Sequence, residues 1–207
     1  MSSDRLRLAV LASGRGSNLG AILEACKREE FPARVVVVVS DRESAAALER
    51  ARREGVDALF LDPKAHGDRA SYDGALTETI GRYRPGLVCL AGFMRLLGSA
   101  FVRRWSGRLL NVHPSLLPSF PGLHPHRQAL AYGVKVSGAT VHFVDDGVDT
   151  GPVILQAGVP VRPDDTEDSL SARILVEEHR LYPEAIRLFA EGRLVVDGRR
   201  VLVKETT

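Results

Sequence analysis

The fold class is decided by the stretch Arg34-Val-Val-Val-Val-Val-Ser40, which holds five consecutive valines. A β-strand with apolar side chains at every position is buried on both faces, as in the parallel sheets of α/β proteins. Segments with helical spacing flank it, at residues 19–30 and at residues 44–54 with Ser44 as a cap. The sequence therefore predicts alternating strands and helices around this strand.

The alternation continues up to His113. Short apolar runs predict strands at residues 6–12, 58–61, 87–91 and 109–113, with helices at residues 68–84 and 99–105. Such an order is typical of a parallel sheet with helices on both faces.

The pattern changes after His113, where an irregular loop rich in proline begins. Long ordered loops of this kind are usually functional. We expect strands at residues 136–144 and 153–161, a hairpin at 194–203, and helices at 126–132 and 166–191. Thr166 should cap the long helix, and Pro183 should kink or break it. The predicted fold class is α/β, a Rossmann-like, mostly parallel sheet with helices on both faces and an antiparallel addition in the C-terminal half.

The length and composition limit the class of protein. The chain has 207 residues, enough for one domain, and we expect a seam near residue 100. Its 28 basic and 26 acidic residues give a net charge of +2, too balanced to indicate a nucleic-acid or membrane-surface protein. No segment reads as a signal peptide or membrane span. Cys26 and Cys89 fall in a predicted helix and a predicted strand, so we expect no disulfide framework and a cytoplasmic protein. No cluster has metal-ligand spacing, so no metal is expected.

A glycine-rich loop, Ser13-Gly-Arg-Gly-Ser-Asn18, follows the first predicted strand and opens the first helix. Glycines let the backbone approach a ligand, and a helix N-terminus offers N–H groups to an anion. The loop suits a phosphate. It suits a dinucleotide less well, because Leu19 stands where the G-x-G-x-x-G fingerprint needs glycine. The alternative is a tight strand-to-helix turn without a ligand.

The second polar motif lies in Leu109-Leu-Asn-Val-His-Pro-Ser-Leu-Leu-Pro118. Asn111 and His113 are two residues apart on a strand and therefore share a face, and Pro114 ends the strand. An amide, an imidazole and the downstream carboxylate of Asp149 suit acyl transfer to an amine. His124, His126 and His142 compete with His113, and we interpret them as loop or strand residues with secondary roles. The alternative is that all of these are turn and strand-end residues with no catalytic role.

These motifs carry a resemblance that extends over nearly the whole chain. The sequence is similar to the folate-dependent formyltransferases, the phosphoribosylglycinamide formyltransferase family in particular. The matching stretches are Ser13–Leu19, Leu90–Leu97, Gly107–Pro118, Phe120–His124 and Asp149–Leu155.

The resemblance implies transfer of a formyl group from 10-formyltetrahydrofolate, as cosubstrate, to the amine of phosphoribosylglycinamide in purine biosynthesis. It implies one formyltransferase domain over residues 1–207, with a nucleotide-binding half at about 1–100 and a catalytic and folate-binding half at about 101–207. Its partners would be small molecules, with no nucleic acid, membrane or metal, and it would be a monomer or homodimer. The catalytic residues would be Asn111, His113 and Asp149, and the phosphoribosylglycinamide site would be Gly16, Ser17, Asn18 and Glu178. The folate site would be Arg69, Met94, Arg95, Leu96, Leu97, Asn111, Val144, Asp145, Asp146, Gly147, Val148 and Asp149.

Two positions depart from the family pattern. Arg15 stands where a small polar residue is frequent, and Thr150 stands where glycine is common and could stiffen the loop after Asp149. Three alternatives remain open. A methionyl-tRNA formyltransferase would be expected to carry a further C-terminal domain, and a formyltetrahydrofolate hydrolase an N-terminal regulatory domain. The third is a nucleotide- or folate-binding module without catalysis.

Overall fold

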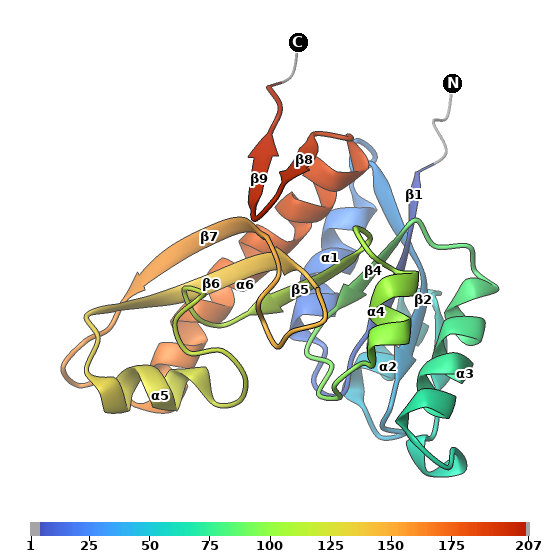
Figure 1. Cartoon of the computed structure of the whole chain (residues 1–207), viewed down its shortest axis with the longest axis horizontal. Coiled ribbons are helices and arrows are strands. Elements are labelled where there is room, and N and C mark those ends of the chain that lie inside the picture. The colour runs from blue at the N-terminus through green and yellow to red at the C-terminus, as the bar shows by residue number, and fades with distance from the viewer. Residues whose placement is uncertain (1–4, 206–207) are drawn as a thin grey trace. The chain divides into compact units, whose positions relative to one another are not determined.

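The computed structural model describes residues 5–205 of the chain (Figure 1). The chain divides into two compact units, with the boundary between Leu110 and Asn111. The sequence analysis placed a seam near residue 100. The two units are described in turn.

The first unit is built on four parallel strands, in the order β3-β2-β1-β4. Their bounds are β1 Leu6–Leu11, β2 Ala33–Ser40, β3 Asp57–Phe60 and β4 Leu87–Leu90. Val37, Val38 and Val39 of β2 are fully buried, as the run of five valines predicts. The parallel sheet of the predicted α/β, Rossmann-like class is therefore confirmed.

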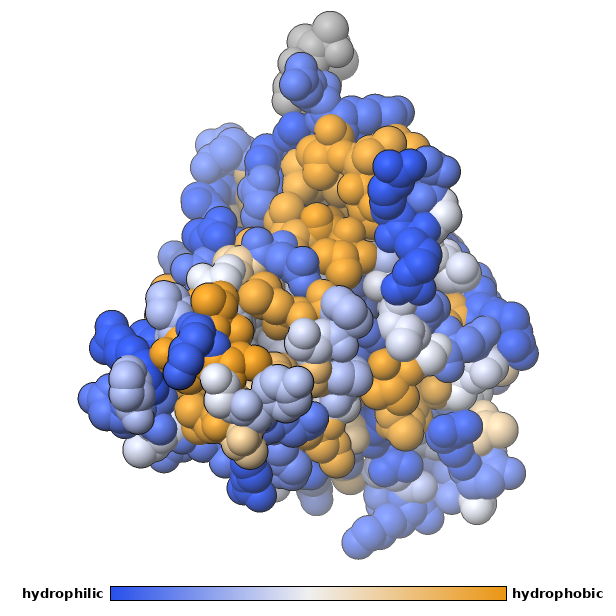
Figure 2. Space-filling view, turned by 60° about the vertical axis from the view of Figure 1, so that its left-hand side comes forward, coloured by the Kyte–Doolittle hydropathy of each residue, from blue (hydrophilic) through white to orange (hydrophobic). Residues whose placement is uncertain are grey.

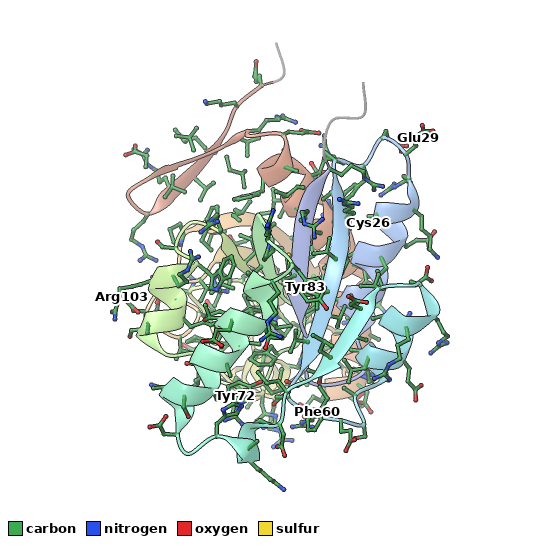
Figure 3. All side chains as sticks on the ribbon, turned by 90° about the vertical axis from the view of Figure 1, so that its right-hand side faces the viewer. Cys26, Glu29, Phe60, Tyr72, Tyr83 and Arg103 are labelled. Atoms are coloured by element: carbon green, nitrogen blue, oxygen red, sulfur yellow. The ribbon has the colours of Figure 1, made fainter. Side chains whose placement is uncertain are left out.

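Helices cover both faces of this sheet. Their bounds are α1 Ser17–Lys27, α2 Ala46–Arg53, α3 Arg69–Gly81 and α4 Ser99–Arg104, with a 3₁₀ turn η1 at Pro63–Ala65. The helices α1 and α2 pack against β2, whereas α3 packs against α4. Figure 3 shows Cys26 of α1 on one side of the strands, and Tyr72 of α3 and Arg103 of α4 on the other. The expected cap Ser44 is wrong, because α2 begins after Ala45, which makes no side-chain cap bond.

The second unit carries the antiparallel strands. β5, Leu109–His113, runs across the unit boundary. β6, Val136–Phe143, pairs antiparallel with β7, Val153–Pro160. β8, Leu194–Asp197, and β9, Arg200–Val203, form a hairpin, as the Asp-Gly turn predicts, and β9 pairs with β7. The antiparallel addition in the C-terminal half is confirmed.

Two helices complete the second unit, α5 at Pro125–Tyr132 and α6 at Glu167–Ala190. The long helix α6 packs against β6 and β7. Thr166 caps it by a reciprocal capping box with Ser169, as predicted. The helix continues through Pro183, so the alternative of a break there is wrong. Pro183 is buried, and packing of its turn against the sheet holds the helix together without the missing N–H.

The surface is mixed in character, and Figure 2 shows apolar side chains gathered on a face that is otherwise largely hydrophilic. Val196, Leu202 and Val203 of the β8–β9 hairpin are among the exposed large hydrophobic residues. Within residues 5–205, no helix is both long enough and apolar enough to cross a membrane.

Candidate active site

The site begins at the carboxyl end of β5. Leu109 and Leu110 are fully buried and fix the strand, so the alternation of side chains turns Asn111 and His113 to one face. His113 is the last residue of the strand and is only 5% exposed. The predicted bounds of this strand are confirmed. The amide and the imidazole lie near its end, next to the loop that follows.

Asp149 reaches this pair from the loop between β6 and β7. Its Oδ2 lies 3.3 Å from Nδ1 of His113, and Nδ2 of Asn111 lies 3.4 Å from its Oδ1. The backbone N–H of Gly122 donates to Oδ2 at 2.8 Å. The structure therefore brings together the three side chains that the sequence analysis singled out. All three belong to the second unit, which begins at Asn111.

The irregular loop after β5 supplies two backbone groups to the cluster. The Nε2 of His113 lies 2.9 Å from the carbonyl oxygen of Phe120, and Gly122 provides the N–H on Asp149. Phe120 has a φ of 56° and Gly122 a φ of 78°, so both carry left-handed backbone that aims these groups at the site. The sequence indicated a functional loop from its prolines, but it could not identify backbone groups as the functional atoms.

The structure adds a fourth side chain, His142 of β6, to which the sequence analysis gave only a secondary role. The ring is 1% exposed, and its Nε2 lies 3.3 Å from Nδ2 of Asn111 and 3.6 Å from Oδ1 of Asp149. Its Nδ1 lies 2.8 Å from the carbonyl oxygen of Phe143, which favours the tautomer with the proton on Nδ1. The Nε2 is then an acceptor for Asn111.

A signal for His142 was present in the sequence. Thr140 and His142 repeat in β6 the two-residue spacing of Asn111 and His113 in β5, so both polar pairs follow a single face of their strand. The other two competing histidines lie at the start of α5. His124 is exposed at the N-terminus of α5, and His126 is a half-buried residue within that helix.

Burial and neighbouring charges set the protonation of the cluster. Burial lowers the pKa of the His113 imidazole below its ordinary value, against the opposing effects of the Asp149 carboxylate and the Phe120 carbonyl. For Asp149, burial would raise the pKa, but the contact with the His142 ring, the N–H of Gly122 and the His113 imidazole outweigh it. The net pKa of Asp149 is lowered, so the carboxylate is ionised near neutral pH beside a neutral imidazole.

This arrangement can move protons. Both ring nitrogens of His113 face oxygen acceptors, the Phe120 carbonyl and the Asp149 carboxylate. A neutral imidazole satisfies one of them, and an imidazolium satisfies both. The site therefore accepts a proton on His113 with a ready partner for the resulting charge. The bonds from Asn111, at 3.3 and 3.4 Å, are long and leave its amide free to turn toward another acceptor.

The first unit contains the glycine loop. Gly16 has a φ of 69° and precedes α1, whose first residue is Ser17; Asn18 is buried. The N–H groups of the first helical turn have no acceptor within the helix and point toward the loop. A Cβ on Gly16 would lie 2.8 Å from the Cα of Ala47, so this glycine is required by its contact with α2. A Cβ on Gly14, by contrast, would meet no atom within 4 Å.

A second segment of the first unit, residues 94–97, lies beside this loop. The N–H of Met94 donates to the Ser13 hydroxyl at 2.8 Å, and Ser13 N–H donates to the carbonyl of Gly92 at 3.0 Å. Met94 is 59% exposed and Leu96 is 64% exposed, whereas Leu97 is half-buried. Met94 and Leu96 are thus large apolar side chains at the surface, at the carboxyl end of a parallel strand, where open α/β sheets bind ligands.

Two arginines from the predicted folate set also lie in the first unit. Arg95 places its guanidinium 5.0 Å from the centre of the Tyr72 ring, and Tyr72 is buried in α3. Arg69 is exposed as the first residue of α3. Burial raises the pKa of the neighbouring Asp73 carboxyl, and the Gly98 N–H and both arginines act against that effect. The two cations therefore share one acidic neighbour.

The remaining predicted residues lie in the second unit. Glu178 is a residue of α6 and is 6% exposed. Val144 and Asp145 are half-buried, while Asp146, Gly147 and Val148 are exposed along the loop that carries Asp149. In the described part of the chain, no group of three or more histidine, cysteine, aspartate or glutamate side chains could hold a metal ion.

Comparison with known proteins gives a consistent result. A model of the formyl transferase family matches residues 6–186. The phosphoribosylglycinamide formyltransferase of Escherichia coli is 51% identical over 203 residues, which cover 95% of this chain and 96% of that protein. The trifunctional purine biosynthetic protein adenosine-3 of Drosophila melanogaster is 48% identical over 95% of this chain, but the chain spans only 15% of that protein.

Solved structures agree with these matches. The glycinamide ribonucleotide transformylase 1 of Symbiobacterium toebii superposes with a TM-score of 0.95 at 58% identity, over 97% of this chain and 95% of its own. A formyltetrahydrofolate deformylase from Pseudomonas syringae gives a TM-score of 0.90 at 26% identity, over 99% of this chain and 67% of its own. The match with the deformylase extends the likeness to a protein of different activity.

Proposed function

The chain belongs to the formyl transferase family, and we propose that it transfers a formyl group from 10-formyltetrahydrofolate to the amine of phosphoribosylglycinamide in purine biosynthesis. The observation that carries the proposal is the Asp149 carboxylate, which is joined at once to His113, Asn111 and the Gly122 N–H. A module that only bound its ligands would not need this buried, ionised cluster.

The reaction that this cluster serves is a transfer between two nitrogens. A bond forms between the substrate amine and the formyl carbon, and the bond from that carbon to the folate nitrogen breaks. One proton leaves the attacking amine and one arrives on the departing nitrogen. The formyl oxygen carries negative charge between these two events, so the site needs a proton carrier and a donor for an oxyanion.

His113 is the proton carrier in this proposal. Burial keeps its imidazole neutral near pH 7, ready to accept a proton. Asp149 then stabilises the imidazolium across 3.3 Å, while the Phe120 carbonyl holds the other ring nitrogen. A fixed carboxylate beside a histidine orients the ring and favours its charged form after the transfer.

Asn111 is the donor for the developing oxyanion. Its amide is held by His142 and Asp149 through long hydrogen bonds, which keep it at the site and yet allow it to donate elsewhere. Removing one such donor typically costs about 3–4 kcal/mol of activation free energy.

The binding residues remain as the resemblance implies. The N-terminus of α1 with Gly16, Ser17 and Asn18 suits the phosphate of phosphoribosylglycinamide. The resemblance also assigns Glu178 of α6 to that substrate. In the first unit, the exposed apolar side chains of Met94 and Leu96 suit the flat ring of a folate. Arg69 and Arg95 supply positive charge for its acidic tail.

Only small molecules take part in this proposed reaction, so it calls for neither a nucleic acid nor a membrane. Cys26 and Cys89 are not joined in a disulfide, which suits a reducing compartment such as the cytoplasm. We propose that the protein acts there as a monomer or a homodimer.

The decisive experiment is a formyl-transfer assay on the purified chain with phosphoribosylglycinamide and 10-formyltetrahydrofolate. We expect formylated product in proportion to released tetrahydrofolate, and a His113→Ala variant that binds both ligands but turns over at a small fraction of the rate. Folate released without formylated product would assign hydrolysis instead. Unchanged turnover in His113→Ala would remove the proposed role of the imidazole.

A further inference from the structure

The loop that carries Asp149 is closed at its base. The N–H of Phe143 donates to the carbonyl of Pro152 at 3.0 Å. Gly151 passes so close to β6 that a Cβ on it would lie 1.8 Å from the Phe143 carbonyl oxygen. Residues 144–151 therefore form a tight loop with both ends fixed on the β6–β7 pair. Any further contact that orders the loop must come from residues within it or from a neighbouring element.

Asp149 stands in this loop with an unfavourable backbone. Its φ is 54°, in the left-handed region that residues other than glycine rarely adopt. In this conformation the carboxylate lies 3.3 Å from the His113 ring. Surrounding contacts must therefore hold it, and the carboxylate's own bond from Gly122 is one of them.

The residue after Asp149 supplies a brace across the loop. The hydroxyl of Thr150 donates to Oδ1 of Asp145 at 2.6 Å, and the same oxygen accepts the N–H of Gly147 at 3.2 Å. Thr150 lies so close to Gly147 that a Cβ on that glycine would be 2.0 Å from the threonine hydroxyl. One side chain thus ties the end of the loop to its beginning.

A second contact comes from outside the loop. Arg199, in the turn between β8 and β9, donates from Nη2 to the carbonyl oxygen of Thr150 at 2.8 Å. The hairpin itself is anchored, because Arg200 of β9 pairs with Val153 of β7. Thr150 is consequently held through its side chain by the loop and through its carbonyl by the hairpin, and the backbone of Asp149 lies directly before it.

We propose that Thr150 and Arg199 are positioning residues, which keep Asp149 in its left-handed conformation with the carboxylate directed at His113. This inference rests on the proposed formyl transfer and names two residues that touch neither reacting group. The hydroxyl brace ties the end of the loop to its beginning and so fixes the backbone on which Asp149 stands. The C-terminal hairpin thereby contributes to the rate of the reaction.

Four variants test the proposal. Thr150→Val keeps the branched shape and removes the hydroxyl, and Thr150→Ser keeps the hydroxyl. Arg199→Met removes the donor to the Thr150 carbonyl. Arg200→Ala is the matched control on the same hairpin, because the Arg200 side chain is exposed and lies 3.7 Å from the Asp197 carboxylate. Thermal unfolding is recorded for each. Thr150, Arg199 and Arg200 are all exposed, so we expect folding to be retained.

In the transfer assay, we expect Thr150→Val to lower kcat about tenfold with less than a twofold change in the KM of phosphoribosylglycinamide. Arg199→Met should lower kcat about threefold, Thr150→Ser should retain at least half of the wild-type kcat, and Arg200→Ala should match the wild type. An unchanged kcat in Thr150→Val, or a Thr150→Ser variant as slow as Thr150→Val, would overturn the proposal. Absence of formyl transfer in the wild type would instead refute the proposed function.

A measurement without substrate provides the second readout. The titration of the His113 ring is followed by NMR in the wild type and in Thr150→Val. The groups around this ring are Asp149 from the loop, His142 from β6, the Phe120 carbonyl and His126 from α5. Asp149 is the one side chain that raises the pKa of His113. We expect that pKa to fall in Thr150→Val as the carboxylate turns away, and an unchanged titration would overturn the proposal even where folding is intact.

Discussion

The catalytic cluster of the second unit and the exposed segments of the first unit hold their side chains in different ways. His113 and His142 are at most 5% exposed, and hydrogen bonds to side chains and to the backbone fix their rings. Met94 and Leu96 are more than half exposed and have no such network around their side chains. The backbone beneath them is fixed, through the bond between Met94 and Ser13.

This difference separates two tasks. Proton transfer needs groups held at hydrogen-bond distance with shifted pKa values, and burial supplies both conditions. Ligand binding by apolar contact needs accessible surface that is covered only when the ligand arrives. We therefore expect changes in the buried cluster to lower kcat, and changes in the exposed segment to raise KM.

The largest effect is expected from Asp149→Asn. The amide has nearly the shape of the carboxylate, but it carries no charge to stabilise a protonated His113, and it puts a donor group among atoms that include the Gly122 N–H, which needs an acceptor. We expect kcat to fall by about 10³-fold, in the range for loss of acid–base assistance. Steady-state kinetics with both substrates measure the effect.

The control for Asp149→Asn is Asp164→Asn, an exposed aspartate of the same unit that belongs to neither binding set. It makes the same chemical change outside the hydrogen-bonded cluster, and we expect kcat within a factor of about three of the wild type. Equal losses of kcat in the two variants would show that the charge of the unit, rather than the geometry of Asp149, controls the rate.

Gly16→Ala should produce the next largest effect, on folding. Its added Cβ would meet the Cα and Cβ of Ala47 at 2.8 Å, and its φ of 69° is unfavourable for alanine. We expect the free energy of unfolding to fall by about 2 kcal/mol, because the left-handed backbone alone costs 1–2 kcal/mol. Denaturant titration measures this change.

Gly14→Ala is the matched control in the same loop, since a Cβ there meets nothing within 4 Å. It should alter the free energy of unfolding by about 0.5 kcal/mol or less. If the two variants unfold alike, the contact between the glycine loop and α2 is not what requires Gly16. The result also decides whether a loss of phosphate affinity in Gly16 variants reports the ligand site or the displaced helix.

Most of the fold could be predicted from the sequence, because the signals for its strands, helices and turns are local. The valine run of β2, the spacing of the helices and the Asp197-Gly198 turn each depend on a few neighbouring residues. The alternative of a helix break at Pro183 was wrong, because packing of α6 on β6 and β7 holds the helix together across this residue. The predicted cap of α2 at Ser44 was wrong for a similar reason. The backbone hydrogen bond from Ala47 N–H to the Gly14 carbonyl, a tertiary contact, decides where that helix begins.

The candidate site shows the same division between local and tertiary signals. Asn111 and His113 were accessible from strand periodicity. Asp149 was predicted from the chemistry of its side chain and from the resemblance, because no local pattern links residues 38 positions apart. The role of His142 needed the pairing of strands, and those of Phe120 and Gly122 needed a loop conformation with positive φ. Sequence patterns identify side chains; they do not identify the backbone atoms that orient them.

The pH dependence of the rate should follow the buried cluster. Burial lowers the pKa of His113 and the hydrogen-bonded Asp149 stays ionised, so the active form, neutral imidazole beside carboxylate, persists as the pH falls. We expect kcat/KM to decline on the acid side with a midpoint below about 6.5, the ordinary value for histidine. Because Asp149 acts to raise the pKa of His113, the midpoint should move lower still in the residual activity of Asp149→Asn. A midpoint above 6.5 in the wild type would mean that the carboxylate outweighs burial.

The smallest effect is expected from Met94→Ala in the exposed segment. Truncation removes apolar surface that the folate would cover, worth about 1 kcal/mol, so the KM for 10-formyltetrahydrofolate should rise about fivefold. The cluster around His113 is unchanged, so kcat should stay within about twofold. Val176→Ala is the control, because Val176 is 65% exposed on α6 and belongs to none of the proposed binding sets. A fall in kcat without a rise in KM for Met94→Ala would break the division of tasks between the two regions, since an exposed apolar side chain would then be acting on the chemical step.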